Sequence, residues 1–200
     1  NYAAAHNNIG ILLNSVGRPD AAVASHLQAI TLQPDYPAAY ENFSDAIKNV
    51  RFSSECREFY PIVIQILTKG NFTRPMDLAP SILSLLQQDP LIKNLPLETS
   101  SSMNVAELSG IIESLHKVPL LHHLMRVCPL PDLQFERFFS NIRRSLLANL
   151  ENLEPSPNLS YFLSTLSLHC FVNEYVYVEN SDEVALVEKL EDKVRANGSH

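Results

Sequence analysis

A six-residue pattern occurs twice in this chain, and the two copies start 34 residues apart. Residues 5–10 read AHNNIG and residues 39–44 read AYENFS, and Leu13 is matched by Ile47. Between the copies lie Gly17 and then a run of residues at helical spacing that ends at Pro34. A fixed period of this length is the sequence signature of stacked helical units. The pattern therefore predicts a pair of helices over residues 2–36 and a further first helix over residues 37–50.

Small residues stand where the two helices of the first unit are expected to cross. Gly10 and Ala22 allow a close approach of the helix axes, and Pro34 stops the second helix. We expect the space between the helices to be filled by larger apolar side chains, namely Ile9, Leu13 and Ile30. With this alternation of small and large residues, the 34-residue unit resembles the tetratricopeptide (TPR) repeat.

The second unit departs from the pattern after its first helix. Residues 49–52 (NVRF) replace the turn glycine, and the helix expected over about 54–69 lacks the alanines of the first unit. Repeats of this kind bury their faces against neighbours, and at least three are normally stacked. We therefore expect further repeats upstream in the parent protein, and exposed repeat faces that allow the chain to oligomerise.

Helix signals continue beyond the repeat, at irregular spacing. They include Pro75 before a leucine stripe, a capping box of Asn104 and Glu107, and a second box of Asn180 and Glu183. The first of these signals predicts a helix over about 75–88, and the box at Asn104 starts a helix that carries apolar residues from Val105 to Leu115. Pro119 and Pro129 bound a short apolar segment. A long helix is expected with Phe135 to Leu153 along one face, another from Ser156 and Pro157, and a terminal helix to about Arg195. Residues 96–103 are expected to form a flexible link. The predicted fold is all-α: TPR units over 1–50, a helical continuation and linker over 51–103, and an irregular helical bundle over 104–200.

Composition excludes several classes of function. The chain is 46% hydrophobic and 18% charged, and no apolar run is long enough to span a membrane. A net charge of −7 argues against a nucleic-acid partner. Three cysteines without a CxxC pair form neither a disulfide framework nor a zinc site, and five scattered glycines form no phosphate-binding loop. We expect a cytoplasmic protein with no metal and no cofactor in this segment.

A second resemblance lies in the later part of the chain. Residues 163–177 (LSTLSLHCFVNEYVY), followed by Ser181, Asp182 and Glu183, resemble a stretch of bacterial proteins in which TPR repeats precede a methyltransferase module. Residues 74–75 and 129–132 resemble the rest of that region. This resemblance implies that S-adenosylmethionine (SAM) would be bound by an attached domain, outside this segment. Similar repeats also precede glycosyltransferase and sulfotransferase modules, so the repeat does not choose the reaction.

The exposed side of each first helix is the candidate binding face for a peptide. Asn8 and Asn42 occupy the same repeat position, and a carboxamide offers a donor and an acceptor to a peptide main chain. The TPR resemblance supports such an asparagine ladder, and the alternative is that these amides bind neighbouring turns or water. The candidate peptide-binding residues are Asn7, Asn8, Ile11, Asn42, Asp45 and Lys48, and Asn14 and Glu41 lie on the same face.

Other chemistry-bearing residues have plainer interpretations. His122 and His123 are neighbours on a helix and point apart, and Pro119 separates them from His116, so the three are not expected to bind one metal ion. His169 and Cys170 face apart for the same reason. We expect Cys170 to fill the core. The basic residues Arg137, Arg143 and Arg144 either bind an anion or an acidic partner or, as we expect, form a solvated face that pairs with Glu136 and Glu151. Tyr175 and Tyr177 either dock the next domain or pack in the core.

Two functions from different classes follow. The first is a protein- or peptide-interaction module, as the non-catalytic recognition region of a SAM-dependent methyltransferase. The second is a helical cap, formed by residues 104–195, that contributes to substrate binding by an attached methyl-, glycosyl- or sulfotransferase domain. No catalytic site is expected in this segment, because no nucleophile, metal or phosphate constellation is present in the sequence.

Overall fold

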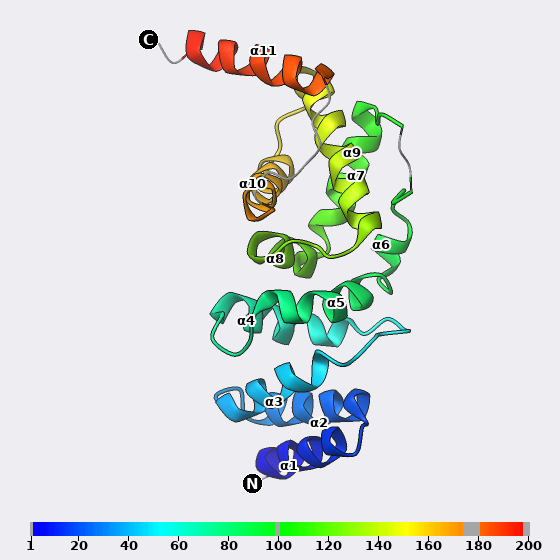
Figure 1. Ribbon diagram of the computed structural model, residues 1–200, viewed down its shortest axis with the longest axis vertical. Helices are drawn as coiled ribbons and strands as arrows, with labels where there is room; N and C mark the ends of the chain where they lie inside the picture. Colours follow the sequence, from blue (N-terminus) through cyan, green and yellow to red (C-terminus); the bar gives the residue numbers. More distant parts are fainter. Residues whose placement is uncertain (1, 99–100, 174–180, 198–200) are drawn as a thin grey trace.

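The computed structural model describes residues 2–98, 101–173 and 181–197, and over these residues the protein is helical with no strand. The predicted all-α fold is therefore confirmed. The helices form an elongated stack with the chain termini at opposite ends (Figure 1). They are α1 (Tyr2–Ser15), α2 (Pro19–Leu32), α3 (Pro37–Ile47), α4 (Tyr60–Lys69), α5 (Pro75–Leu86), α6 (Pro90–Lys93), α7 (Val105–His116), α8 (Pro119–Val127), α9 (Leu133–Asn149), α10 (Pro157–Val172) and α11 (Ser181–Asn197), with short 3-10 helices at Arg57–Phe59 and Leu150–Asn152.

Prolines and side-chain caps set where these helices begin. Proline opens α2, α3, α5, α6, α8 and α10, where its fixed φ suits the first turn and its missing N–H would have no partner in any case. Asn104 accepts a hydrogen bond from the backbone N–H of Glu107, and the Glu107 carboxylate accepts one from the backbone N–H of Asn104. This reciprocal pair is the capping box that the sequence predicts at the start of α7.

The first two helices form the predicted hairpin, and α3 packs on α2. Gly10 and Ala22 are buried as expected, Ile30 is 1% exposed and Leu13 is half-buried. Ile9 differs from the expectation, because 47% of it is exposed. Its side chain lies on the outer side of α1, away from α2, and therefore does not fill the space between the two helices.

Packing continues without interruption into the second half of the chain. Helix α8 packs on α4 and α5, α10 packs on α8 and α7, and α9 carries α11. A single cluster of buried apolar side chains runs from Ala22 in α2 to Leu166 in α10. The division at residues 50 and 103 stays a prediction, and this core is continuous across both positions.

The helix expected over 54–69 starts later, at Tyr60, after the 3-10 turn Arg57–Phe59. Asp89 holds this start: its carboxylate accepts hydrogen bonds from Arg57 (2.6 Å), the Tyr60 hydroxyl (2.8 Å) and the backbone N–H of Leu91 (2.8 Å). Asp89 is 1% exposed. Burial alone would raise the pKa of Asp89, but the three hydrogen bonds outweigh it and lower that pKa. A buried carboxylate therefore joins the start of α4 to the start of α6.

The expected flexible link is fixed at its far end. Three side chains of α9 bind the strap Ser101–Met103: Asn141 donates to the Ser101 carbonyl (2.9 Å), Ser145 accepts from the Met103 N–H (3.0 Å), and Asn149 donates to the Met103 carbonyl (3.2 Å). Met103 is 4% exposed. These bonds tie residues 101–103 to α9, and the flexibility of the link over residues 96–103 stays a prediction.

Two basic residues of α9 bind a carboxylate that the sequence did not pair with them. Glu183 of α11 is 3% exposed and accepts hydrogen bonds from Arg143 (2.8 Å) and Arg144 (3.3 Å). Glu151 lies 3.7 Å from Lys189. Glu183, which the sequence assigns to a capping box, therefore anchors α11 to α9, and its expected partner Asn180 lies outside the described residues.

Candidate functional site

A chain of hydrogen-bonded polar side chains joins α2, α1 and α3 near the N-terminal end of the stack. The carboxamide oxygen Oδ1 of Asn7 lies 2.9 Å from Nδ1 of His26 and accepts a hydrogen bond from Nδ2 of Asn42 at 3.1 Å. The Asn7 Nδ2 lies 3.5 Å from the Tyr36 hydroxyl, toward which it donates. We call His26, Asn7 and Asn42 the amide relay.

The relay fixes the protonation state of its histidine. Because Asn7 Oδ1 is an acceptor, Nδ1 of His26 must carry the proton, and Nε2 is then a bare acceptor. Nε2 is buried and has no hydrogen-bond partner in the structure. Burial lowers the pKa of His26, so the ring is neutral at pH 7. The ring lies directly against Gly10, where an added Cβ would be 2.4 Å from Cε1 of His26.

The structure separates the six candidate peptide-binding residues into two groups. Asn7 is 3% exposed and its side-chain bonds are made within the chain, so it supports the face from beneath. Asn8, Ile11 and Asp45 are exposed, while Asn42 and Lys48 are half-buried. Lys48 donates to Asp45 at 2.8 Å. The solvent-facing residues Asn8, Ile11, Asn42, Asp45 and Lys48 form what we call the α1/α3 face.

Asn42 is the one carboxamide of this face that the relay holds in place. Its Nδ2 uses one hydrogen on Asn7, which leaves a second N–H and the Oδ1 acceptor without partners among the described residues. The sequence pairs Asn42 with Asn8 by repeat position, whereas the bond joins Asn42 to Asn7. The sequence offered one signal for this relay: Gly10 on the first helix leaves room for a large side chain on the second helix, and His26 is the residue that occupies it.

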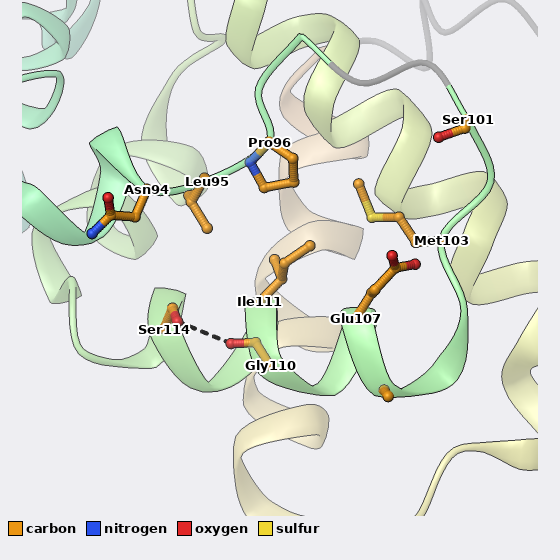
Figure 2. A pocket seen from close by; sticks show the side chains of 10 residues that line it. Asn94, Leu95, Pro96, Ser101, Met103, Glu107, Gly110, Ile111 and Ser114 are labelled. Carbon is orange, nitrogen blue, oxygen red and sulfur yellow. Dashed lines mark hydrogen bonds between the residues drawn. The ribbon is translucent and has the colours of Figure 1, made fainter.

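A separate pocket lies where the strap Ser101–Met103 passes α7 (Figure 2). Its volume is about 340 Å³, and it combines an apolar floor with a polar rim. Pro96, Met103 and Ile111 provide apolar surface, and Glu107 and Ser114 lie at its edge (Figure 2). An added Cβ at Gly110 would meet nothing within 4 Å, so the glycine leaves open space in the middle of α7. This pocket is large enough for a small molecule.

Two histidines and two cysteines lie in the packing of α8 and α10, namely His122, His169, Cys128 and Cys170. His122 is 2% exposed and lies 3.1 Å from the Leu115 carbonyl, and His169 is 1% exposed and lies 3.0 Å from the Met125 carbonyl. Burial raises the pKa of the Cys170 thiol, an effect that nearby Arg143 partly offsets, so the thiol is protonated at pH 7. Burial also raises the pKa of Cys128 to about 12. Neither cysteine has the lowered pKa of a nucleophile.

Within the described ranges, no three His, Cys, Asp or Glu side chains are grouped so as to hold a metal ion. His123 Nδ1 lies 2.9 Å from the Pro119 carbonyl within α8, whereas His122 contacts the Leu115 carbonyl of α7. Tyr175 and Tyr177, the candidate docking residues, lie outside the described residues. None of the described helices is both long and apolar enough to cross a membrane.

Comparisons with known proteins return no match: no family model fits the chain, and no curated protein sequence or solved structure is similar to it.

Proposed function

We propose that this chain is a protein-interaction module that binds an extended peptide on the α1/α3 face. The supporting observation is the amide relay, in which buried His26 and Asn7 hold the carboxamide of Asn42 with one N–H and one carbonyl oxygen free. These two groups match the carbonyl and N–H of a peptide main chain.

Preorganisation is the physical reason for assigning the role to Asn42. A carboxamide on a free side chain loses rotamer freedom when it binds, at a cost of about 0.5–1.5 kcal/mol. The hydrogen bond from Asn42 to Asn7 restricts this freedom before the peptide arrives. Around it, exposed Ile11 offers an apolar contact, and the ion pair of Lys48 and Asp45 borders the face.

The test uses a displayed library of random 12-residue peptides, selected against the 200-residue chain. Peptides that bind are then resynthesised with one main-chain N–H methylated at a time. If the carboxamides bind the main chain, methylation at one or two positions should weaken binding by about five- to tenfold, the value of one hydrogen bond. Asn42→Ala should remove that sensitivity, and Gln28→Ala, an exposed amide on α2, should leave it unchanged. Equal binding by every methylated peptide would refute main-chain recognition.

We further propose, on the sequence resemblance alone, that this module serves as the non-catalytic recognition region of a cytoplasmic SAM-dependent methyltransferase. SAM would then be bound by an attached domain, and the peptide on the α1/α3 face would belong to its protein substrate or to a partner. Sequencing the coding region downstream of residue 200 tests this extension. A strand followed by a glycine-rich turn and an acidic residue about 20 positions later would support it, and a downstream region without them would overturn it.

The pocket beside α7 supports a second candidate function, that of a helical cap which contributes to small-molecule binding. Its walls are fixed by the three bonds from α9 to the strap Ser101–Met103. Gly110→Leu should fill the pocket without disturbing the helix, since the added side chain enters open space. Ligands found by screening a metabolite library against the chain should lose binding in Gly110→Leu and keep it in Asn42→Ala. Unchanged binding in Gly110→Leu would place the ligand elsewhere.

A further inference from the structure

The outer side of α1 carries a stripe of exposed apolar residues. Tyr2, Ala5, Ile9, Leu12 and Val16 follow one another at intervals of three and four residues, which is the spacing of one helix face. The exposed fractions are 83% for Tyr2, 47% for Ile9, 65% for Leu12 and 68% for Val16. Helix α1 contains no Asp, Glu, Lys or Arg, so charge does not oppose contact along this stripe. A continuous apolar stripe of this kind marks an interaction surface.

The internal repeat shows what fits such a stripe. Moved forward by 34 residues, the five positions become Tyr36, Ala39, Phe43, Ala46 and Val50. Helix α3, which carries the middle three, packs on α2. There Ala39, Phe43 and Ala46 are each 0% exposed, Val50 is 2% exposed and Tyr36 is half-buried. The stripe on α1 is therefore the counterpart of a surface that is covered in the next unit, where α3 packs on α2 and the Phe43 ring also lies 6.0 Å from the ring of Phe59.

A polar group gives the same register independently. Asn42 donates to Asn7 of the preceding unit at 3.1 Å. Its counterpart 34 residues earlier is Asn8, which is exposed and whose side chain makes no hydrogen bond to the described residues. A preceding unit stacked as the first unit stacks on the second would bring its own Asn7 equivalent to Asn8. One placement of one partner thus covers the apolar stripe and satisfies this amide.

We propose that the stripe on α1 is the docking surface for the second helix of another 34-residue unit, with the apolar face that α2 presents to α3. A second copy of this chain does not supply that helix, because its α2 is already packed between its own α1 and α3. Helix α2 buries Ala22, Val23, Ala29 and Ile30, and we expect the docked helix to carry small and branched apolar side chains of this kind.

The experiment duplicates residues 1–34 and fuses them directly ahead of residue 1, which keeps the period of the repeat. We expect the added unit and the chain to unfold in one transition at a higher urea concentration than the chain alone. Backbone amides of Tyr2–Ser15 in the original chain should exchange with solvent about tenfold more slowly. Asn8→Ala should reduce the increase in the urea midpoint of the fusion and should leave the urea midpoint of the chain alone unchanged.

Leu12→Glu, placed in the original α1, is the decisive variant. In the 200-residue chain it should leave the unfolding midpoint nearly unchanged, because Leu12 is 65% exposed. In the fusion, Leu12→Glu should abolish the increase in the unfolding midpoint. Separate unfolding of the added unit, or the same gain with and without Leu12→Glu, would overturn the proposal. Sedimentation of the native chain as a dimer that Leu12→Glu dissociates would also overturn it, since the stripe would then pair with a second copy.

Discussion

Replacing Gly10 by alanine tests the contact on which the amide relay depends. A Cβ at residue 10 would lie 2.4 Å from Cε1, 2.6 Å from Nε2 and 2.7 Å from Nδ1 of His26, well inside van der Waals contact. The ring has no room to turn aside, because His26 is 1% exposed. Any shift would also stretch the 2.9 Å contact between His26 Nδ1 and Asn7 Oδ1. The substitution should therefore disturb the packing and the relay together.

Three terms set the size of the effect. Alanine is favoured over glycine inside a helix by about 1 kcal/mol. Overpacking a tight interior site costs about 1–3 kcal/mol, and leaving the buried polar groups of His26 and Asn7 unpaired costs about 1–3 kcal/mol. Gly10→Ala should therefore lower the free energy of unfolding by about 1–5 kcal/mol in total.

Urea unfolding followed by circular dichroism measures this change, and Gly110→Ala is the matched control. Both glycines lie inside helices, but an added Cβ at Gly110 meets nothing within 4 Å. Gly110→Ala should therefore raise stability by about 0.5–1 kcal/mol. In a His26→Ala background, Gly10→Ala should change sign and stabilise. A loss of the same size with and without the His26 ring would refute the reasoning.

Three further predictions concern buried charges and histidines. Burial, partly offset by the bond to the Leu115 carbonyl, lowers the pKa of His122 to about 4 from 6.5. Between these values the unfolded chain binds a proton that the folded chain does not, so His122→Gln should remove about 2 kcal/mol of the stability lost from pH 7 to pH 5. Asp89→Asn should cost about 2–3 kcal/mol at pH 7 in urea unfolding, because the charge-assisted bond from Arg57 is weakened and one acceptor oxygen is lost. Since the pKa of Asp89 is lowered from 3.8, that cost should shrink as pH falls through its folded value. Glu183→Gln should speed hydrogen exchange of the backbone amides in α11 without affecting those in α7. Equal exchange of α11 in the native chain and in Glu183→Gln would show that Glu183 does not anchor α11 to α9.

Short-range features of the sequence predicted the helices and where several of them begin. Proline at the first position of α5, α8 and α10, and the capping box of Asn104 and Glu107, act within a few residues of themselves. Such signals can be seen in the sequence, because the partner of each group lies on the same turn of helix. The all-α fold and the first hairpin follow from them.

The contacts that a sequence pattern missed join residues far apart in the chain. Glu183 lies 40 residues from Arg143, and Asn149 lies 46 residues from Met103. An arginine of α9 can pair with any of several carboxylates, and the packing of α9 against α11 selects the one that it binds. The sequence of either helix alone does not determine this packing. Asn42 bonds Asn7 rather than Asn8 for the same reason: the offset between α1 and α3 sets the pairing, and the repeat period gives only the equivalence of positions.

The most direct test of peptide recognition observes the side-chain amide of Asn42 itself. Side-chain NH₂ signals of asparagine are resolved in ¹⁵N–¹H spectra, and a peptide selected from the displayed library can be titrated into the labelled chain. We expect the signals of Asn42 and Asn8 to shift in a saturable way, together with backbone signals of α1 and α3. Saturable shifts confined to the pocket around Gly110, with Asn42 unchanged, would contradict the account.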